Sequence, residues 1–482
     1  MLRKLKERWN GIPLTVKVSI SYTVCSILQK CISFFTAPLF IKMLPTEQYG
    51  QFTVYQSWSG IISLVLTLNL AYGSFSTAMV KYEEDRGGYI SSVEGISLLL
   101  SAVFFLVYLP FNGLWTKLFK LPVSLICLMV VEQLSLNAIQ LWSGQKRFEF
   151  KYISVILVSL AISVLSPLFA YILVSRTENK GYALTAGYAA GNIFFGTIIF
   201  LILAVRGKKL FNREYWNYAL GFNIPLLAYY LSQTVFNQSD RIMISHIFGD
   251  GKAAMYGVPY SLATILTFVL NAINNSYVPW FFQTLKSGRY RDNRNVSVAI
   301  SVLMAILLSG IIWFAPEIIM IMAGEEYAEA VYVIPPVAIS MLLLFYSQLF
   351  INVEFYYEEK GKLIWASIGA AIVNAVLNLI FLPRYGYMAA AYTTLVSYIV
   401  FAISNQWAMR KIAQERADRI DDAFDYRILV FGAIAFGLTS FIGVMLYPFI
   451  IPRILTAVAV LALLLIKRDY FMDMYKKIKE SD

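Results

Sequence analysis

Fourteen long apolar runs are the feature that most constrains how this 482-residue chain can fold. An α-helix rises about 1.5 Å per residue, so about 20 residues cross the roughly 30 Å hydrocarbon core of a bilayer. The runs occupy residues 16–42, 52–75, 90–112, 121–143, 152–175, 182–205, 218–247, 253–283, 297–323, 330–355, 363–383, 387–409, 428–447 and 450–466. They lack the two-residue alternation of membrane β-strands. The sequence therefore predicts an all-α polytopic membrane protein with about 14 transmembrane helices.

The composition agrees with a chain surrounded by lipid and excludes several kinds of chemistry. Hydrophobic residues make up 59% of the chain and charged residues only 14%, whereas soluble domains carry about 25% charged residues. The three cysteines lie in apolar runs and His246 is the only histidine, so we expect neither a disulfide framework nor a metal site nor histidine catalysis. The chain has no phosphate-binding G-x-x-x-x-G-K-[ST] loop, so we expect no ATP hydrolysis and no cofactor.

The distribution of basic residues predicts the orientation of these helices. If the N-terminus is cytoplasmic, the inner segments hold 30 of the 40 lysines and arginines, and the outer segments hold eight. Such an excess is typical of cytoplasmic loops, so both chain ends are predicted to be cytoplasmic. The same residues account for the net charge of +11, and their spread over short segments argues against nucleic-acid binding.

Two sequence patterns recur at offsets of 207 and 215 residues and indicate an internal repeat. Tyr-Gly at 49–50 recurs at 256–257, and Gln-x-x-x-Asn at 133–137 recurs at 348–352. Six helices separate the matched positions, and six crossings preserve orientation, so the predicted repeats are parallel. The expected parts are a cytoplasmic tail at 1–15, a six-helix bundle at 16–217, a second six-helix bundle at 218–427, two extra helices at 428–466 and a basic cytoplasmic tail at 467–482.

Polar side chains recur at helical spacing within several runs and predict a hydrated cavity. In the first run, the serines and threonine at 19, 23, 26 and 33 fall on the same helix face as Lys30. The polar side chains that we expect to line the cavity are Ser26, Gln133, Asn137, Asn237, Asn271, Asn274, Asn374 and Asn378. Interhelical hydrogen bonding is the competing explanation for each of these residues taken singly.

Charged side chains within the predicted spans point to what the cavity binds. Lys30 and Arg241 are the two cations there, and a charge inside a membrane marks a functional site by default. Either Asp240 neutralises Lys30 in an ion pair, or the cations bind an anionic cargo. We place the carboxylates of Glu132, Asp240 and Glu354 at membrane depth and expect them to be the candidates for coupling transport to an ion gradient. Because Glu354 is near a helix end, solvation is the alternative explanation for it.

The segment 370–400 carries a resemblance to a known family. It reads AAIVNAVLNLIFLPRYGYMAAAYTTLVSYIV and resembles the N-x-x-L-N…P-x-x-G…G-A-A-x-x-T segment of bacterial polysaccharide exporters, with Met388 where that family usually has a glycine. Residues 37–53 are similar to the family's segment between the first two helices, and residues 237–257 to its Asp-Arg segment. The family is the multidrug/oligosaccharidyl-lipid/polysaccharide (MOP) exporter superfamily, and within it the branch of O-antigen-type flippases.

The resemblance implies both an architecture and a cargo. It implies a V-shaped transporter of two bundles that moves an undecaprenyl-diphosphate-linked oligosaccharide from the cytoplasmic to the periplasmic leaflet of a bacterial cell membrane by alternating access. Lys30 and Arg241 would then supply counter-charge to the diphosphate. The expected partners are the lipid-linked oligosaccharide, membrane lipids, and a polysaccharide polymerase and glycosyltransferases.

Two other functions compete with this interpretation. A cation-coupled multidrug antiporter of the same superfamily would have twelve helices and a net acidic cavity, whereas this chain has a further helix pair at 428–466. A membrane-embedded polymerase or glycosyltransferase would carry a sizeable outer loop, whereas the outer loops here are short. We therefore expect a transporter rather than an enzyme.

Overall fold

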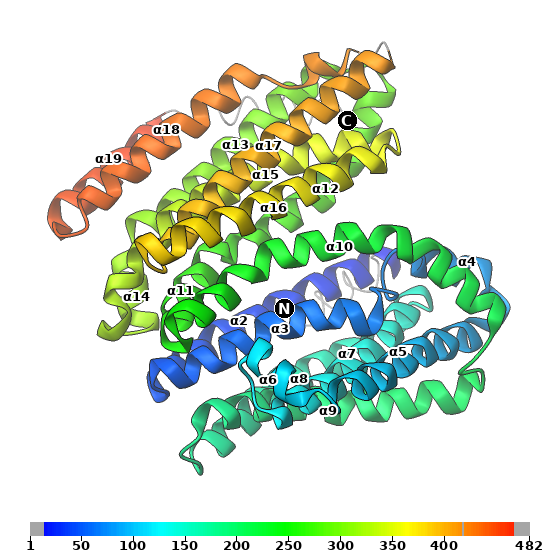
Figure 1. The fold of residues 1–482 in the computed structure, drawn as a ribbon. Helices are drawn as coiled ribbons and strands as arrows, with labels where there is room; N and C mark the ends of the chain where they lie inside the picture. Colours follow the sequence, from blue (N-terminus) through cyan, green and yellow to red (C-terminus); the bar gives the residue numbers. More distant parts are fainter. Residues whose placement is uncertain (1–13, 417–418, 467–482) are drawn as a thin grey trace, which may run out of the picture. The chain divides into compact units, whose positions relative to one another are not determined.

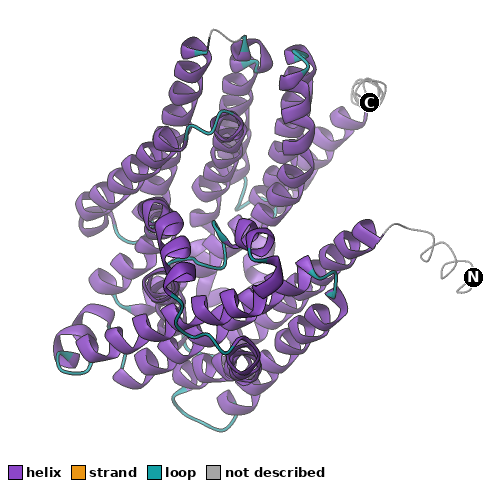
Figure 2. Cartoon of the chain, turned by 90° about the vertical axis from the view of Figure 1, so that its right-hand side faces the viewer, coloured by secondary structure: helices purple, strands orange, loops and turns teal. Residues whose placement is uncertain are grey.

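The computed structural model describes residues 14–416 and 419–466, and this part of the chain is helical with short connections and no strand (Figure 1, Figure 2). The predicted all-α fold is therefore confirmed. Most of the predicted tail at 1–15 and all of the tail at 467–482 lie outside the described residues.

Each of the predicted apolar runs coincides with one helix or with two consecutive helices. The helices of the first half are α2 (Leu14–Met43), α3 (Thr46–Thr67), α4 (Phe75–Lys81), α5 (Arg86–Tyr108), α6 (Asn112–Phe119), α7 (Val123–Phe148), α8 (Tyr152–Val174), α9 (Lys180–Gly207), α10 (Arg213–Phe248) and α11 (Asp250–Ala263). Those of the second half are α12 (Thr267–Lys286), α13 (Tyr290–Trp313), α14 (Ala315–Met322), α15 (Ile334–Tyr356), α16 (Lys360–Tyr385), α17 (Ala389–Glu415), α18 (Tyr426–Met445) and α19 (Ile450–Ile466). Short 3₁₀ segments are η1 (Glu83–Asp85), η2 (Thr264–Leu266), η3 (Glu325–Val333) and η4 (Ile420–Ala423).

Ten helical segments in the described part of the chain are long and apolar enough to cross a membrane. The predicted spans outside this set are those of α3, α10, α17 and α19. The last of these has 17 residues, and the other three carry more polar side chains along their length. The chain is therefore a multi-pass membrane protein.

Side-chain caps explain where several of the helices begin. Asp85, Asn179, Asn212 and Asp425 precede α5, α9, α10 and α18, and each accepts a hydrogen bond from a backbone N–H in the first turn. The first N–H groups of a helix have no partner within the helix, so a carboxylate or amide oxygen at this position stabilises the end by about 1 kcal/mol.

The chain divides into two compact units, residues 1–254 and 255–482. In the first unit, α9 packs against α3, α5, α7 and α8, and α10 packs against α3 and α5. In the second unit, α17 packs against α15 and α16, and α13 packs against α15 and α18. The division falls after Ala254, which agrees with the packing of α10 against α3 and α5. The expected bundle boundaries, including the one at 217/218, stay a prediction. Whether the two expected six-helix bundles are sequence repeats stays a prediction.

Close packing in the first unit depends on glycine at positions where two helices nearly touch. A Cβ atom added at Gly187 of α9 would lie 2.2 Å from Ala170 Cα of α8, and one added at Gly196 would lie 2.4 Å from Ser135 Cβ of α7. Small residues allow membrane helices to approach so closely that backbone and side-chain contacts replace lipid.

We predict that Gly187→Ala destabilises the protein, because the new methyl group meets the backbone of α8, and overpacking of this kind costs about 1–3 kcal/mol. Gly369→Ala in α16 is the matched control, since a Cβ atom there meets nothing within 4 Å. The measurement is the unfolding temperature of the detergent-solubilised protein, which should fall for Gly187→Ala and not for Gly369→Ala. Equal unfolding temperatures for the two variants would contradict this packing argument.

Candidate functional site

Arg241 is positioned along one face of α10 by neighbours on the same helix. Its Nη1 donates to Gln238 Oε1 at 2.8 Å and to the carbonyl oxygen of Asn237 at 3.4 Å. The Asn237 side chain donates in turn to the carbonyl oxygen of Gln233 at 2.8 Å. Gln238 lies over α3, since its Cγ is 3.5 Å from the place of a Cβ atom on Gly60. The guanidinium is therefore fixed beside α3 while it keeps partial exposure.

Lys30 and Ser26 are both exposed on α2. Gln29, the residue before Lys30, lies about 100° away around the helix and donates to Ser159 O at 3.3 Å and Ser163 Oγ at 3.2 Å on α8. Gln29 thus attaches α2 to α8, whereas Thr23, Ser26, Lys30 and Ser33 of α2 are exposed. No hydrogen bond or ion pair joins Lys30 to any other residue that the structure describes. Asp240, the expected alternative partner of Lys30, is buried on α10.

The polar residues of α7 lie inside the first unit, where they connect three helices. Glu132 accepts hydrogen bonds from Tyr55 OH on α3 at 2.7 Å and from Asn192 Nδ2 on α9 at 2.8 Å. Gln133 donates to Ser59 Oγ on α3 at 2.6 Å. Glu132 and Gln133 are both buried, so these bonds replace the water that the polar groups have lost.

Asn137 of α7 is bonded to Glu94, a carboxylate that was not expected from the sequence. Its Nδ2 donates to Glu94 Oε2 on α5 at 2.9 Å and to Ser97 Oγ at 3.1 Å. Glu94 is fully buried and was not among the carboxylates expected at membrane depth, which were Glu132, Asp240 and Glu354. The available signal was the position of Glu94 inside the apolar run 90–112.

In the second unit, the asparagines of the segment that resembles polysaccharide exporters join α16 to α17. Asn378 Nδ2 donates to Asn374 Oδ1 at 3.2 Å, and Asn374 Nδ2 donates to Thr394 Oγ1 at 3.3 Å. Thr393 Oγ1 donates to Asn378 Oδ1. All four side chains are buried, so within this unit they form a polar contact between helices.

The remaining expected residues of the second unit lie on α12 and α15. Asn352 Nδ2 donates to Asn274 Oδ1 at 2.9 Å, which joins α15 to α12, while Asn271 is exposed. Asn352 and Asn137 occupy matching positions of the recurring Gln-x-x-x-Asn pattern, and both make a hydrogen bond to another helix. Glu354 is buried in the last turn of α15, and within residues 14–416 and 419–466 neither of its oxygens has a hydrogen-bond donor.

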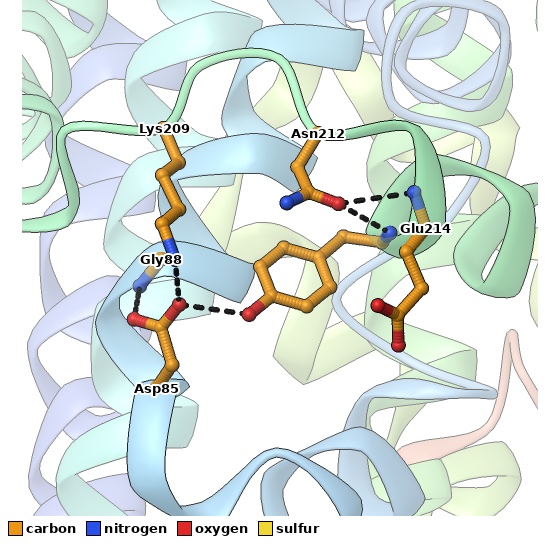
Figure 3. Close-up of polar contacts among 6 residues, drawn as sticks. Asp85, Gly88, Lys209, Asn212 and Glu214 are labelled. Carbon is orange, nitrogen blue, oxygen red and sulfur yellow. Dashed lines mark hydrogen bonds and ion pairs between the residues drawn. The ribbon is translucent and has the colours of Figure 1, made fainter.

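A polar cluster holds the connection between α9 and α10 against α5 (Figure 3). Asp85 accepts hydrogen bonds from Gly88 N at 3.0 Å, from Lys209 Nζ at 2.5 Å and from Tyr215 OH at 2.7 Å. Asn212 begins α10 by accepting from the backbone N–H groups of Glu214 and Tyr215. We call Asp85, Gly88, Lys209 and Tyr215 the Asp85 cluster. It combines residues about 125 positions apart, which is why the sequence did not reveal it.

The described side chains offer no evident metal centre. No group of three or more His, Cys, Asp or Glu side chains in the described ranges is placed to hold a metal ion. The chemistry available to the site is therefore that of two cations, buried carboxylates and amide or hydroxyl groups.

Comparison with known protein families identifies relatives of the sequence. The model of the family described as "Polysaccharide biosynthesis protein" matches residues 15–285. The "Lsg locus putative protein 1" of Haemophilus influenzae is 23% identical over 371 residues, which cover 74% of this chain and 88% of that protein. An "uncharacterized membrane protein" of the same species is 22% identical over 390 residues, which cover 76% of this chain and 90% of that protein.

Solved structures of transporters share the fold. The lipid II flippase MurJ in an inward closed conformation superposes with a TM-score of 0.68 at 15% identity, covering 94% of this chain and 100% of that chain. An inward-facing multidrug resistance transporter of the MATE family, from the MOP superfamily, gives a TM-score of 0.58 at 12% identity, covering 82% of this chain and 99% of that chain. The predicted fold class is confirmed by both likenesses.

We predict that Asn378→Ala weakens the second unit, because it removes the hydrogen bond that Thr393 Oγ1 donates to Asn378 and the one that Asn378 donates to buried Asn374 Oδ1, at a cost of about 1–3 kcal/mol. Asn275→Ala on α12 is the control, because Asn275 is exposed. Thermal unfolding and the yield of folded protein in detergent should both fall for Asn378→Ala alone. If Asn378→Ala were as stable as Asn275→Ala, the α16–α17 contact would not be the structural role of this residue.

Proposed function

Because the chain belongs to the polysaccharide biosynthesis protein family and shares the fold of MOP-superfamily transporters, we propose that it is a flippase for undecaprenyl-diphosphate-linked oligosaccharide. It moves an O-antigen or capsular repeat unit from the cytoplasmic to the periplasmic leaflet of a bacterial cell membrane by alternating access. The observation that carries the proposal is the cationic Lys30, which is exposed within the apolar segment Ile20–Met43 and has no counter-ion among the described residues.

The electrostatics of the cargo support this assignment. A diphosphate carries at least two negative charges, and moving them through hydrocarbon without counter-charge is prohibitively costly. Lys30 and Arg241 belong to the same unit, on two helices that both contact α3. Charge-assisted hydrogen bonds from an ammonium and a guanidinium to phosphate oxygens are stronger than neutral ones. We assign the two cations to the diphosphate.

The polar side chains divide into two groups by burial. In the first unit Ser26 is exposed and Asn237 half-buried, and in the second unit Asn271 is exposed and Asn274 half-buried. We assign these four side chains to sugar hydroxyls. Gln133, Asn137, Asn374 and Asn378 are buried and bonded across helices, so we assign them to positioning the helices. This division refines the expectation that all eight line the cavity.

The proposed cycle uses an ion gradient rather than ATP. Glu132, Asp240 and Glu354 are the carboxylates that we proposed from the sequence for this coupling, and all three are buried. Both termini are proposed to be cytoplasmic, which places the basic connections on the side where the substrate is assembled. Glycosyltransferases there, and a polysaccharide polymerase on the other side, are the proposed partners.

A cation-coupled multidrug antiporter is the second candidate, because the MATE transporter has the same fold. Its cargo is cationic, and an exposed lysine without a described counter-ion would repel such a cargo. The flippase therefore fits the charge of the site better.

We predict that deletion of the gene causes lipid-linked oligosaccharide to accumulate on the cytoplasmic side of the membrane, and that the wild-type chain clears it. Lys30→Ala and Arg241→Ala should each slow clearance by about tenfold or more, which corresponds to about 1.4 kcal/mol of lost interaction. The measurement is the amount of intermediate in the inner leaflet, at matched expression of each variant.

Two further variants make this experiment specific. Lys42→Ala removes an exposed lysine from the far end of the same helix and should clear the intermediate normally, and Lys30→Arg should restore most of the activity. Normal clearance by both alanine variants would disprove the cation mechanism. Absence of any accumulation on deletion would favour the antiporter.

A further inference from the structure

The interior of the first unit holds an acidic side chain, Glu94, that the mechanism above does not use. Glu94 is fully buried on α5. Its Oε2 accepts the hydrogen bond from Asn137, but no described residue donates to its Oε1. The Oδ1 atom of Asn137 also lacks a described donor. Glu94 and Asn137 therefore each have one buried oxygen atom without a hydrogen-bond donor among the described residues.

Glu132, in the same unit, differs from Glu94 in the number of its hydrogen-bond donors. Each of its two oxygens accepts a hydrogen bond, one from Tyr55 and one from Asn192. Glu94 has a single donor, the neutral amide of Asn137, and no ion pair with a described lysine or arginine. An unpaired carboxylate in an apolar core costs several kcal/mol, and one bound proton removes this cost and creates an O–H donor.

The groups around Glu94 supply no substitute for that proton. The helices packed against α5 are α3, α4, α7, α9 and α10, together with η1. On α9 there is no titratable residue between 189 and 205, and on α5 itself Arg86 and Tyr89 are near the end that follows η1. The titratable side chains on the other packed elements include Tyr55 on α3, Lys81 on α4, Glu83, Glu84 and Asp85 on η1, Glu132 on α7, and Arg213, Glu214, Tyr215 and Tyr218 on α10. Of these, Tyr55 is bonded to Glu132, and Tyr215 to Asp85.

The stretch of α5 around Glu94 also supports the connection between α9 and α10. A Cβ atom on Gly95 would lie 1.8 Å from the carbonyl oxygen of Leu210 in that connection. Trp216 Nε1 of α10 donates to Ser92 O at 2.9 Å. Within the Asp85 cluster, Asp85 accepts from Lys209 and Tyr215 (Figure 3). A change of charge at Glu94 would therefore act on the α5–α7 contact and on the support of this connection.

We propose that Glu94 is a proton-binding site, protonated in the arrangement described and exchanging its proton during the transport cycle. A metal cation would need several more oxygen ligands than the two unpartnered atoms here, whereas a single proton satisfies the site. The proton is taken up from one side of the membrane and released to the other, and no bond of the cargo is made or broken. The coupling rests on the proposed flippase function, whereas the protonation of Glu94 does not.

The protonation is tested by infrared spectroscopy on the full-length chain in lipid nanodiscs. The wild-type spectrum minus that of Glu94→Gln should show, at neutral pH, the C=O stretch of a protonated carboxylic acid, and this band should disappear as the pH is raised. Glutamine is isosteric with the protonated acid, so the variant should fold. Glu178→Gln, at an exposed position, is the control and should give no such band. The proposal would be overturned if the wild-type spectrum minus that of Glu94→Gln showed no such band, or if the band responded to sodium instead of pH.

The coupling is tested by transport in proteoliposomes with an imposed pH gradient. Wild-type and Glu178→Gln transport of lipid-linked oligosaccharide should accelerate with the gradient, and Glu94→Gln should lose this acceleration by about tenfold or more. An equal response of Glu94→Gln would overturn the coupling role. If no variant transported the lipid, the proposed function would fail, and the infrared band would still decide the protonation of Glu94.

Discussion

The cost of an unpaired polar group in hydrocarbon is the constraint on which the rest of this structure depends. Helices satisfy the backbone, because every interior N–H and C=O bonds within its own segment. Polar side chains either bond to groups of their own helix, as Arg241 does on α10, or pair across helices. Glu132 with Tyr55 and Asn192 is one example, and the Asn374–Asn378 contact with Thr393 is another. These contacts also determine which helices lie next to each other.

The side chains that do not follow this pattern are the informative ones. Lys30 is exposed on α2, while the neighbouring Gln29 bonds this helix to α8, so the charge of Lys30 requires water or an anionic partner. Glu94 is buried with one oxygen unpartnered in the described chain, so it requires a proton. The exposed charge of Lys30 suits an anionic cargo, and the protonation of Glu94 suits a proton gradient that drives transport. Both lie in the first unit, whose connection between α9 and α10 is held by the Asp85 cluster.

The sequence predicted the parts of the fold that depend on local pattern. Apolar runs of about 20 residues located the membrane helices, and the four-residue spacing placed Lys30 and Ser26 on one face of α2. The sequence pattern did not show which helices pack against each other. A helical period gives the face on which Asn374 lies but not that this face meets Thr394, and nothing local shows that α10 packs on α3. The position of Glu94 inside the apolar run 90–112 could be read from the sequence, but its contact with Asn137 of α7 could not.

The central claim is that this chain carries a lipid-linked diphosphate sugar across a bilayer. The most direct measurement uses purified protein in liposomes that contain undecaprenyl-diphosphate-linked oligosaccharide in both leaflets, with a membrane-impermeant glycosidase added outside. The account predicts that nearly all of the lipid-linked sugar becomes digestible in liposomes with the protein, and only the outer-leaflet half in protein-free liposomes. Digestion that stops at the outer-leaflet half in both preparations, with the protein folded and inserted, would contradict it.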